Sequence, residues 1–244
     1  MKSILKKIKI HPMLLIFILI FILIGRFKFI IFFTLLILVH ESGHIIMSLL
    51  FKWNINKIII LPFGGMIKYD ELVNRKLIEE FLIAISGVIM QYIFCIIFKN
   101  IIHYKYFSFI NYLIIIFNLI PIYPLDGSKI LNVIFNKITN FRNSILLTLL
   151  VSYICISILS TAFFSINKLI IFVIYILFKE TTKIYNEKEL IFNKFLLERN
   201  LYDFKFKKRK TINSVVKMKK DYKHLFKIDN EYITEKYYLK KMFE

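Results

Sequence analysis

The chain has 244 residues, of which 58% are hydrophobic, and a formal net charge of +19 at pH 7. A soluble core of this size could not bury that much apolar surface, so the composition excludes an ordinary globular domain. In a soluble protein the excess of Lys and Arg would suggest nucleic-acid binding, but in a membrane protein these residues flank the spans and face anionic lipid. We therefore expect an all-α polytopic membrane protein that binds no nucleic acid.

Long apolar runs separated by short basic clusters predict about six transmembrane helices. The first run follows four lysines, and we interpret it as an uncleaved span because Gly25–Lys28 follows it without a small-x-small cleavage pattern. The spans are expected at about 10–25, 29–51, 79–98, 106–123, 144–164 and 167–183.

Three other segments complete the predicted organisation. After the second span, Pro62, Phe63, Gly64 and Gly65 predict a turn, and hence a short membrane-dipping loop or hairpin. The stretch 127–143 is amphipathic and is expected at the membrane interface. From about Asn186 the composition becomes rich in lysine. We therefore predict a six-span domain at 1–185 and a small basic cytoplasmic tail at 186–244.

The distribution of Lys and Arg predicts the orientation of the spans. With the N-terminus inside, the inner segments hold most of the basic residues, whereas the outer loops hold only Arg26, Lys28, Lys99, Lys105 and Lys168. We expect a multi-pass integral membrane protein with both termini in the cytoplasm.

The second span carries ionisable residues in its middle, where they are costly and indicate function. His40, Glu41 and His44 form the pattern His-Glu-x-x-His. Histidines at i and i+4 share one face of a helix and can bind a single zinc ion, while the intervening Glu reaches a metal-bound water as general base. This pattern predicts an intramembrane metalloprotease.

A catalytic zinc site needs three protein ligands and one open position. Asp126 is the best candidate for the third ligand, because it follows the fourth span in the segment Pro124-Leu125-Asp126-Gly127. Non-helical backbone at membrane depth is tolerated where it lines a cavity or is buried in protein. A surface turn explains this segment equally well by itself, and the His-Glu-x-x-His pattern favours the ligand.

Two other function classes stay open on the residues alone. A transporter or metal permease would use the same polar residues for passage, although no inverted repeat is visible. A catalytically silent membrane scaffold would use the tail to recruit partners. Tolerance of Glu41→Gln would favour the transporter, and absence of bound zinc would favour the scaffold.

Three motifs together resemble the site-2 protease family of intramembrane zinc metalloproteases: HESGH in the second span, PFGG after it and NLIPIYPLDG after the fourth. The resemblance implies one Zn²⁺ per chain, held by His40, His44 and Asp126, with Glu41 as general base. It further implies that seven residues shape the site or bind the substrate: Phe63, Gly64, Gly65, Asn118, Pro121, Pro124 and Gly127.

Within this family the layout is most similar to the stage IV sporulation protein FB group. That likeness implies cleavage of a membrane-associated sigma-factor precursor, inhibitory membrane proteins as partners, and residence in the outer forespore membrane of a spore-forming bacterium. Two departures stand out. Gly87 is followed four residues later by Gln91, where the family commonly has Asn, so we expect a modest change in geometry.

The tail is the second departure. It resembles a truncated or degenerate version of the nucleotide-sensing CBS domain with which that group usually ends. Its shortness argues against ATP binding, and we favour a basic appendage that docks on the membrane surface or on the substrate.

Overall fold

The computed structural model describes residues 7–10, 12–61, 64–70, 72–99, 104–163, 168–228 and 231–243. These residues form two compact units, the first from 1–71 and 82–120 and the second from 72–81 and 121–244. The predicted division at residue 185 falls within one continuous helix, α8 (Lys168–Leu201), and the tail as a separate domain stays a prediction.

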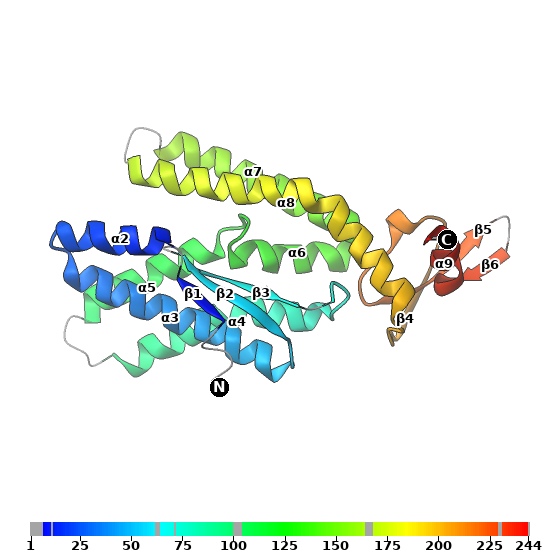
Figure 1. Cartoon of the computed structure of the whole chain (residues 1–244), viewed down its shortest axis with the longest axis horizontal. Coiled ribbons are helices and arrows are strands. Elements are labelled where there is room, and N and C mark those ends of the chain that lie inside the picture. The colour runs from blue at the N-terminus through cyan, green and yellow to red at the C-terminus, as the bar shows by residue number, and fades with distance from the viewer. Residues whose placement is uncertain are drawn as a thin grey trace. The chain divides into compact units, whose positions relative to one another are not determined.

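The first unit combines helices with a small sheet (Figure 1). Strand β1 (Ile8–Ile10) pairs in parallel with β2 (Ile55–Leu61), which pairs antiparallel with β3 (Gly64–Tyr69). The helices are α2 (Pro12–Leu23), α3 (Phe27–Leu50), α4 (Leu77–Ile97, whose first turn belongs to the second unit) and α5 (Tyr104–Leu119).

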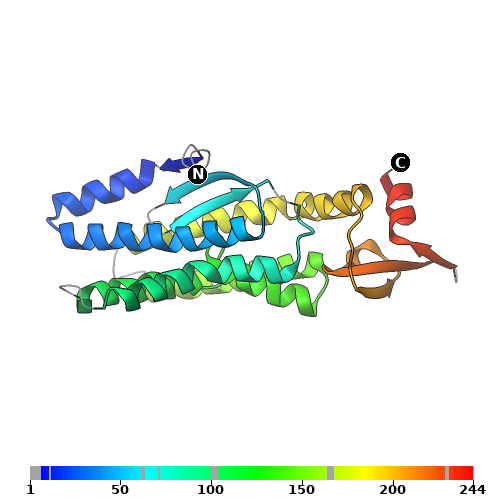
Figure 2. The same ribbon diagram turned by 90° about the horizontal axis from the view of Figure 1, so that it is seen from below.

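The β2–β3 hairpin runs alongside α3 (Figure 2) and confirms the hairpin expected after the second span. Helix α3 ends where Lys52 adopts a left-handed conformation, φ 57°. There the amides of Lys52 and Trp53 donate to the carbonyls of Leu49 and Ser48, the Schellman arrangement that ends a helix. The run of β-branched isoleucines then favours a strand.

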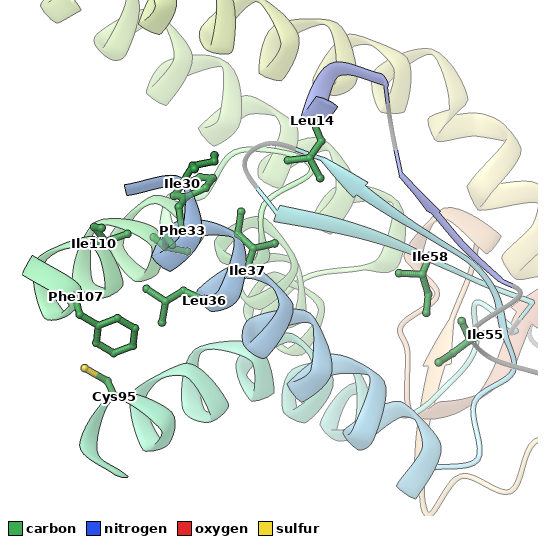
Figure 3. Packing of buried hydrophobic residues seen from close by; sticks show 11 residues of the cluster. Leu14, Ile30, Phe33, Leu36, Ile37, Ile55, Ile58, Cys95, Phe107 and Ile110 are labelled. Carbon is green, nitrogen blue, oxygen red and sulfur yellow. The ribbon is translucent and has the colours of Figure 1, made fainter. Parts of the chain in front are cut away.

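The core of the first unit joins α3 to α5 (Figure 3). Leu36 and Ile37 from α3 are buried with Phe107 and Ile110 from α5, and Ile58 of β2 belongs to the same cluster. Apolar burial of this kind fixes which side of α3 turns inward, and His40, Glu41 and His44 lie among its buried residues.

The second unit contains α6 (Asp126–Ile138), α7 (Phe141–Phe163) and α8, followed by a second small sheet. Strand β5 (Tyr222–Ile228) pairs in parallel with β4 (Lys208–Ile212) and antiparallel with β6 (Glu231–Thr234). The short 3-10 helix η1 (Val215–Lys217) follows β4, and α9 (Glu235–Phe243) follows β6. The all-α prediction is therefore wrong in detail, because both ends of the chain contribute strands to small sheets.

The C-terminal sheet and α9 share a hydrophobic core with α7 and α8. Phe141 at the start of α7 stacks on Phe195 of α8 with ring centroids 4.2 Å apart. Met218, Phe226 and Leu239 of the tail complete this buried cluster. The tail strands are therefore packed against helices, as small sheets require for stability.

A buried ionic network joins α8 to the segment before α4. The Glu198 carboxylate accepts from the amides of Val73 and Asn74 and from the Asn74 side chain. Arg199, whose side chain is 1% exposed, pairs with Glu235 at 3.0 Å and donates to the Asn74 side chain. Lys220 forms a further ion pair with Glu80, in the first turn of α4.

Among the described residues, three helices are long and apolar enough to cross a membrane: α3, α4 and α7. Helix α2 is apolar but short, with an apolar core of Leu14–Leu23. The predicted number of six spans stays a prediction, while the mostly helical architecture with membrane-length helices is confirmed.

Candidate metal centre

His40 and His44 lie one turn apart on α3, and both side chains are buried. Their Nε2 atoms are 3.1 Å apart. Two glycines allow α4 to approach this part of α3: a Cβ on Gly43 would lie 2.5 Å from the Ser86 carbonyl oxygen, and a Cβ on Gly87 would lie 2.4 Å from His44 Nε2. Small residues permit close helix packing in membranes, and here they bring α4 against the imidazoles.

Each imidazole has one contact with α4 that fixes its tautomer. Nδ1 of His44 lies 2.7 Å from the Ile83 carbonyl, which can only accept, so this nitrogen carries the hydrogen. Nδ1 of His40 lies 2.9 Å from Oε1 of Gln91. The Gln91 amide is oriented by its Nε2, which donates to the Asn111 carbonyl at 3.4 Å. His40 therefore donates from Nδ1 as well.

With a hydrogen on each Nδ1, both neutral imidazoles present an Nε2 lone pair to the same small volume. Two such lone pairs 3.1 Å apart repel each other unless a cation binds them. Two nitrogen ligands of one tetrahedral zinc ion, each at about 2.0–2.1 Å, lie about 3.3 Å apart. The pair therefore fits zinc, and the contacts to Gln91 and Ile83 are the outer hydrogen bonds that metal-bound histidines require.

Glu41 is buried beside this pair and is held by the hairpin. Its Oε1 accepts from the backbone amide of Gly65 at 2.5 Å, while its Oε2 is buried and has no hydrogen-bond partner among the described residues. A Cβ on Gly65 would lie 2.3 Å from Oε2, so only glycine leaves space for the carboxylate. One oxygen is thus anchored and the other is available to a reactant.

Gly64, the first residue of β3, also lies close to Asn118 at the end of α5. Gly64 has φ +142°, which favours glycine, and a Cβ built there would lie 3.4 Å from Asn118 Oδ1. Asn118 is buried, and its Nδ2 donates to the Ile114 carbonyl of its own helix. The first unit thus brings together His40, Glu41, His44, Gly64, Gly65 and Asn118. Phe63 lies outside the described residues.

The remaining predicted site residues belong to the second unit. Asp126 is the first residue of α6, it is buried, and its Oδ1 pairs with Lys129 Nζ at 2.8 Å. A carboxylate here is also favoured by the helix dipole, so its position alone does not identify a ligand. Pro121 and Pro124 lie in the non-helical segment before it, and Gly127 is buried in the first turn of α6.

The sequence analysis does not identify the groups that orient the two histidines, or those that hold the non-helical segment before Asp126. The Ile83 carbonyl has no sequence signal, because every residue has one. Gln91 was noted only as a departure from a family pattern, although an amide inside an apolar span is a signal of a polar contact. Ser152 of α7 and Thr181 of α8 were also missed, and both touch the backbone between Pro121 and Pro124.

Comparison with known proteins agrees with this chemistry. The sequence model of peptidase family M50 matches residues 28–106 and 100–162 of the chain. The chain belongs to this family and is an intramembrane metalloprotease.

Two curated relatives and one solved structure are similar to the chain. It is 34% identical to Stage IV sporulation protein FB of Bacillus subtilis (strain 168) over 209 residues. The matched region covers 79% of this chain and 71% of the relative. The chain is 31% identical over 112 residues to a zinc metalloprotease of Methanocaldococcus jannaschii, covering 41% of this chain and 32% of that protein. The structure of a site-2 protease from Methanocaldococcus jannaschii matches with a TM-score of 0.59 and 23% identity, covering 72% of this chain and 89% of that one, and shows the common fold.

Proposed function

We propose that this chain hydrolyses a peptide bond of a membrane-associated protein at or near the cytoplasmic face, using one zinc ion held by His40, His44 and Asp126. The single observation that carries this proposal is the pair of Nε2 atoms 3.1 Å apart, with both Nδ1 atoms engaged as donors. The choice of Asp126 as third ligand is supported by its burial and by the family motif.

Bound zinc would supply Lewis-acid chemistry, polarising the scissile carbonyl and acidifying the attacking water. Oε2 of Glu41 would accept a proton from the attacking water and pass it to the leaving amine. The Gly65 amide holds Oε1, so the carboxylate cannot rotate away from the reactant. Gln91 and the Ile83 carbonyl keep both imidazoles in the tautomer that binds metal.

The substrate is proposed from the relatives. The chain is similar over most of its length to a stage IV sporulation protein. The resemblance to that group supports a sigma-factor precursor as the substrate. Inhibitory membrane proteins and residence in the outer forespore membrane follow from the same resemblance. The distribution of basic residues supports cytoplasmic termini.

The test is cleavage of a co-expressed membrane-associated precursor by the wild-type protein and by Glu41→Gln. We expect Glu41→Gln to bind one zinc per chain and to cleave at least about 100-fold more slowly, since general acid–base catalysis contributes about 10²–10⁴-fold. Equal cleavage by both proteins would overturn the role of Glu41. Loss of zinc from Glu41→Gln would instead make Glu41 a ligand.

A further inference from the structure

The backbone just before Asp126 is non-helical and has polar groups that no helix ladder can satisfy. It lies between α5 and α6, and Pro121 and Pro124 each remove one backbone donor. The segment satisfies part of its own demand, because the Leu125 amide donates to the Ile122 carbonyl at 2.8 Å. In the apolar part of a membrane an unsatisfied backbone group is strongly destabilising, so the remaining groups need partners.

Two hydroxyls on two different helices supply those partners. Ser152 of α7 is buried, and its Oγ lies 3.1 Å from the Pro121 carbonyl and accepts from the Tyr123 amide at 3.4 Å. Thr181 of α8 is buried, and its Oγ1 lies 3.2 Å from the Tyr123 carbonyl oxygen. Tyr123 is thus held at its amide by α7 and at its carbonyl by α8, three residues before Asp126.

An ordinary explanation exists for each hydroxyl, because Ser and Thr in helices commonly bond to the carbonyl four residues earlier. Ser152 has such a contact to Thr148 at 2.8 Å, and Thr181 has one to Leu177 at 2.8 Å. That explanation does not account for the hydrogen bond from the Tyr123 amide, which donates to Ser152 Oγ. It also does not explain why both hydroxyls reach the same residue. Ser157, on the same helix as Ser152, donates instead to the carbonyl of Ile154 in its own helix.

We propose that Ser152 and Thr181 are positioning residues for Asp126. By fixing the backbone of Tyr123 they fix the segment that carries the carboxylate into the first turn of α6. The inference rests on the proposed role of Asp126 as a zinc ligand, and it predicts that loss of either hydroxyl weakens metal binding without removing a ligand.

The experiment measures zinc affinity by competition with a chromophoric chelator, and the visible spectrum of the Co²⁺-substituted protein, on the full-length chain in detergent. The test variants are Ser152→Ala and Thr181→Val, with Thr181→Ser as the variant that keeps the hydroxyl. Ser157→Ala is the matched control. Loss of a partner outside the ligand set commonly costs 10–100-fold in metal affinity, so we expect each test variant to bind zinc about 10-fold or more weakly.

A double-mutant cycle separates this inference from the proposed function. If Asp126→Ala leaves zinc affinity unchanged, the ligand assignment fails. If Asp126→Ala weakens binding but Ser152→Ala and Thr181→Val behave like Ser157→Ala, the positioning role fails. The hydroxyl variants are also made in the Asp126→Ala background. If they weaken zinc binding there by the same factor as in the wild-type background, they act on something other than Asp126 and the positioning role fails. Where Thr181→Val is not recovered folded, Ser152→Ala, which removes a single small hydroxyl, decides the outcome.

Discussion

Oε1 of Gln91 lies 2.9 Å from Nδ1 of His40, so a side chain on α4 determines how a metal-binding residue on α3 presents its other nitrogen. Nδ1 of His44 is engaged in the same way by the carbonyl of Ile83, which lies about two helical turns before Gln91 on α4. The metal-binding character of α3 therefore depends on a neighbouring helix that contributes no ligand.

Replacing Gln91 by Leu removes the acceptor and leaves the His40 tautomer undetermined. We expect zinc affinity to fall about 10–100-fold, as for other partners of metal-bound histidines, with slower cleavage as a consequence. Gln91→Glu keeps an acceptor and should retain most of the affinity. Competition with a chelator measures both, and a Gln91→Leu variant that binds zinc as tightly as the wild type would show that Gln91 has no such role.

The close approach of Gly87 to both histidines allows a steric test of the same site. A Cβ here would lie 2.4 Å from His44 Nε2 and 2.7 Å from His40 Nε2, inside the volume that the metal would use. We expect Gly87→Ala to lose zinc almost completely while the fold is kept, since Ala is favoured over Gly in a helix by about 1 kcal/mol. Elemental analysis of the purified protein and its melting temperature are the two measurements. Ile89→Ala, at an exposed position of the same helix, is the control and should keep its zinc.

Gly65 gives the complementary outcome, in which catalysis is lost and the metal is retained. A Cβ on Gly65 would collide with the Glu41 carboxylate, because it would lie 2.3 Å from Oε2. We expect Gly65→Ala to displace Glu41 and to reduce cleavage by about 100-fold or more, the contribution of a general base. Zinc content should stay at the wild-type level. A variant that cleaves normally would mean that the hairpin does not constrain Glu41.

The extent to which the sequence predicts this site depends on the kind of group involved. His40, Glu41 and His44 are predictable because their spacing has a direct geometric meaning on a helix. The hairpin is predictable because Gly64 and Gly65 disfavour a helix after the second span. The hydrogen-bond partners of the histidines are not predictable from the sequence. Every residue has a backbone carbonyl, and only the packing of two helices brings that of Ile83 to His44.

The fold shows the same division. The long apolar runs predict α3, α4 and α7 to within a few residues of their bounds, because apolar length is a strong signal. The contacts of the C-terminal segment are not predictable in this way: Phe226 and Leu239 join Phe141 of α7 and Phe195 of α8 in one core. Contacts between segments so distant in sequence leave no local pattern.

His224 predicts an acid sensitivity that is separate from the metal site. Its Nε2 accepts from the Lys219 amide at 3.1 Å and its Nδ1 lies 3.2 Å from Glu235 Oε2, so the neutral ring is held on both sides. Burial lowers the pKa of His224, and the charge of Arg199 acts in the same direction, against the hydrogen bond to Glu235.

The sign follows from comparing the folded and unfolded chains. Below the ordinary histidine pKa of 6.5 the unfolded chain takes up a proton that the folded chain resists, so stability falls as the pH drops below about 6.5. We expect the melting temperature to fall between pH 7.5 and 5.5 by more in the wild type than in His224→Gln. The difference between the two proteins isolates His224 from the other histidines, and parallel pH profiles would contradict the prediction.

Arg199 provides the test of whether the tail is a separable appendage. Its guanidinium is buried, it pairs with Glu235 of α9, and it donates to the Asn74 side chain and to the carbonyls of Lys219 and Tyr222. Removing one partner of a buried ion pair leaves an uncompensated charge, which costs about 3–5 kcal/mol. We therefore expect Arg199→Met to lower the melting temperature of the whole second unit, in a single transition.

The matched control is Arg209→Met, because Arg209 is an exposed arginine of β4 and exposed substitutions change stability by only about 0.5 kcal/mol. Limited proteolysis distinguishes the two ways in which the tail can respond. If Arg199→Met releases the tail while α7 and α8 keep their melting temperature, the tail folds as an independent domain. If both are lost together, the shared core of Phe141, Phe195 and Phe226 makes the C-terminal sheet and α9 part of the helical unit.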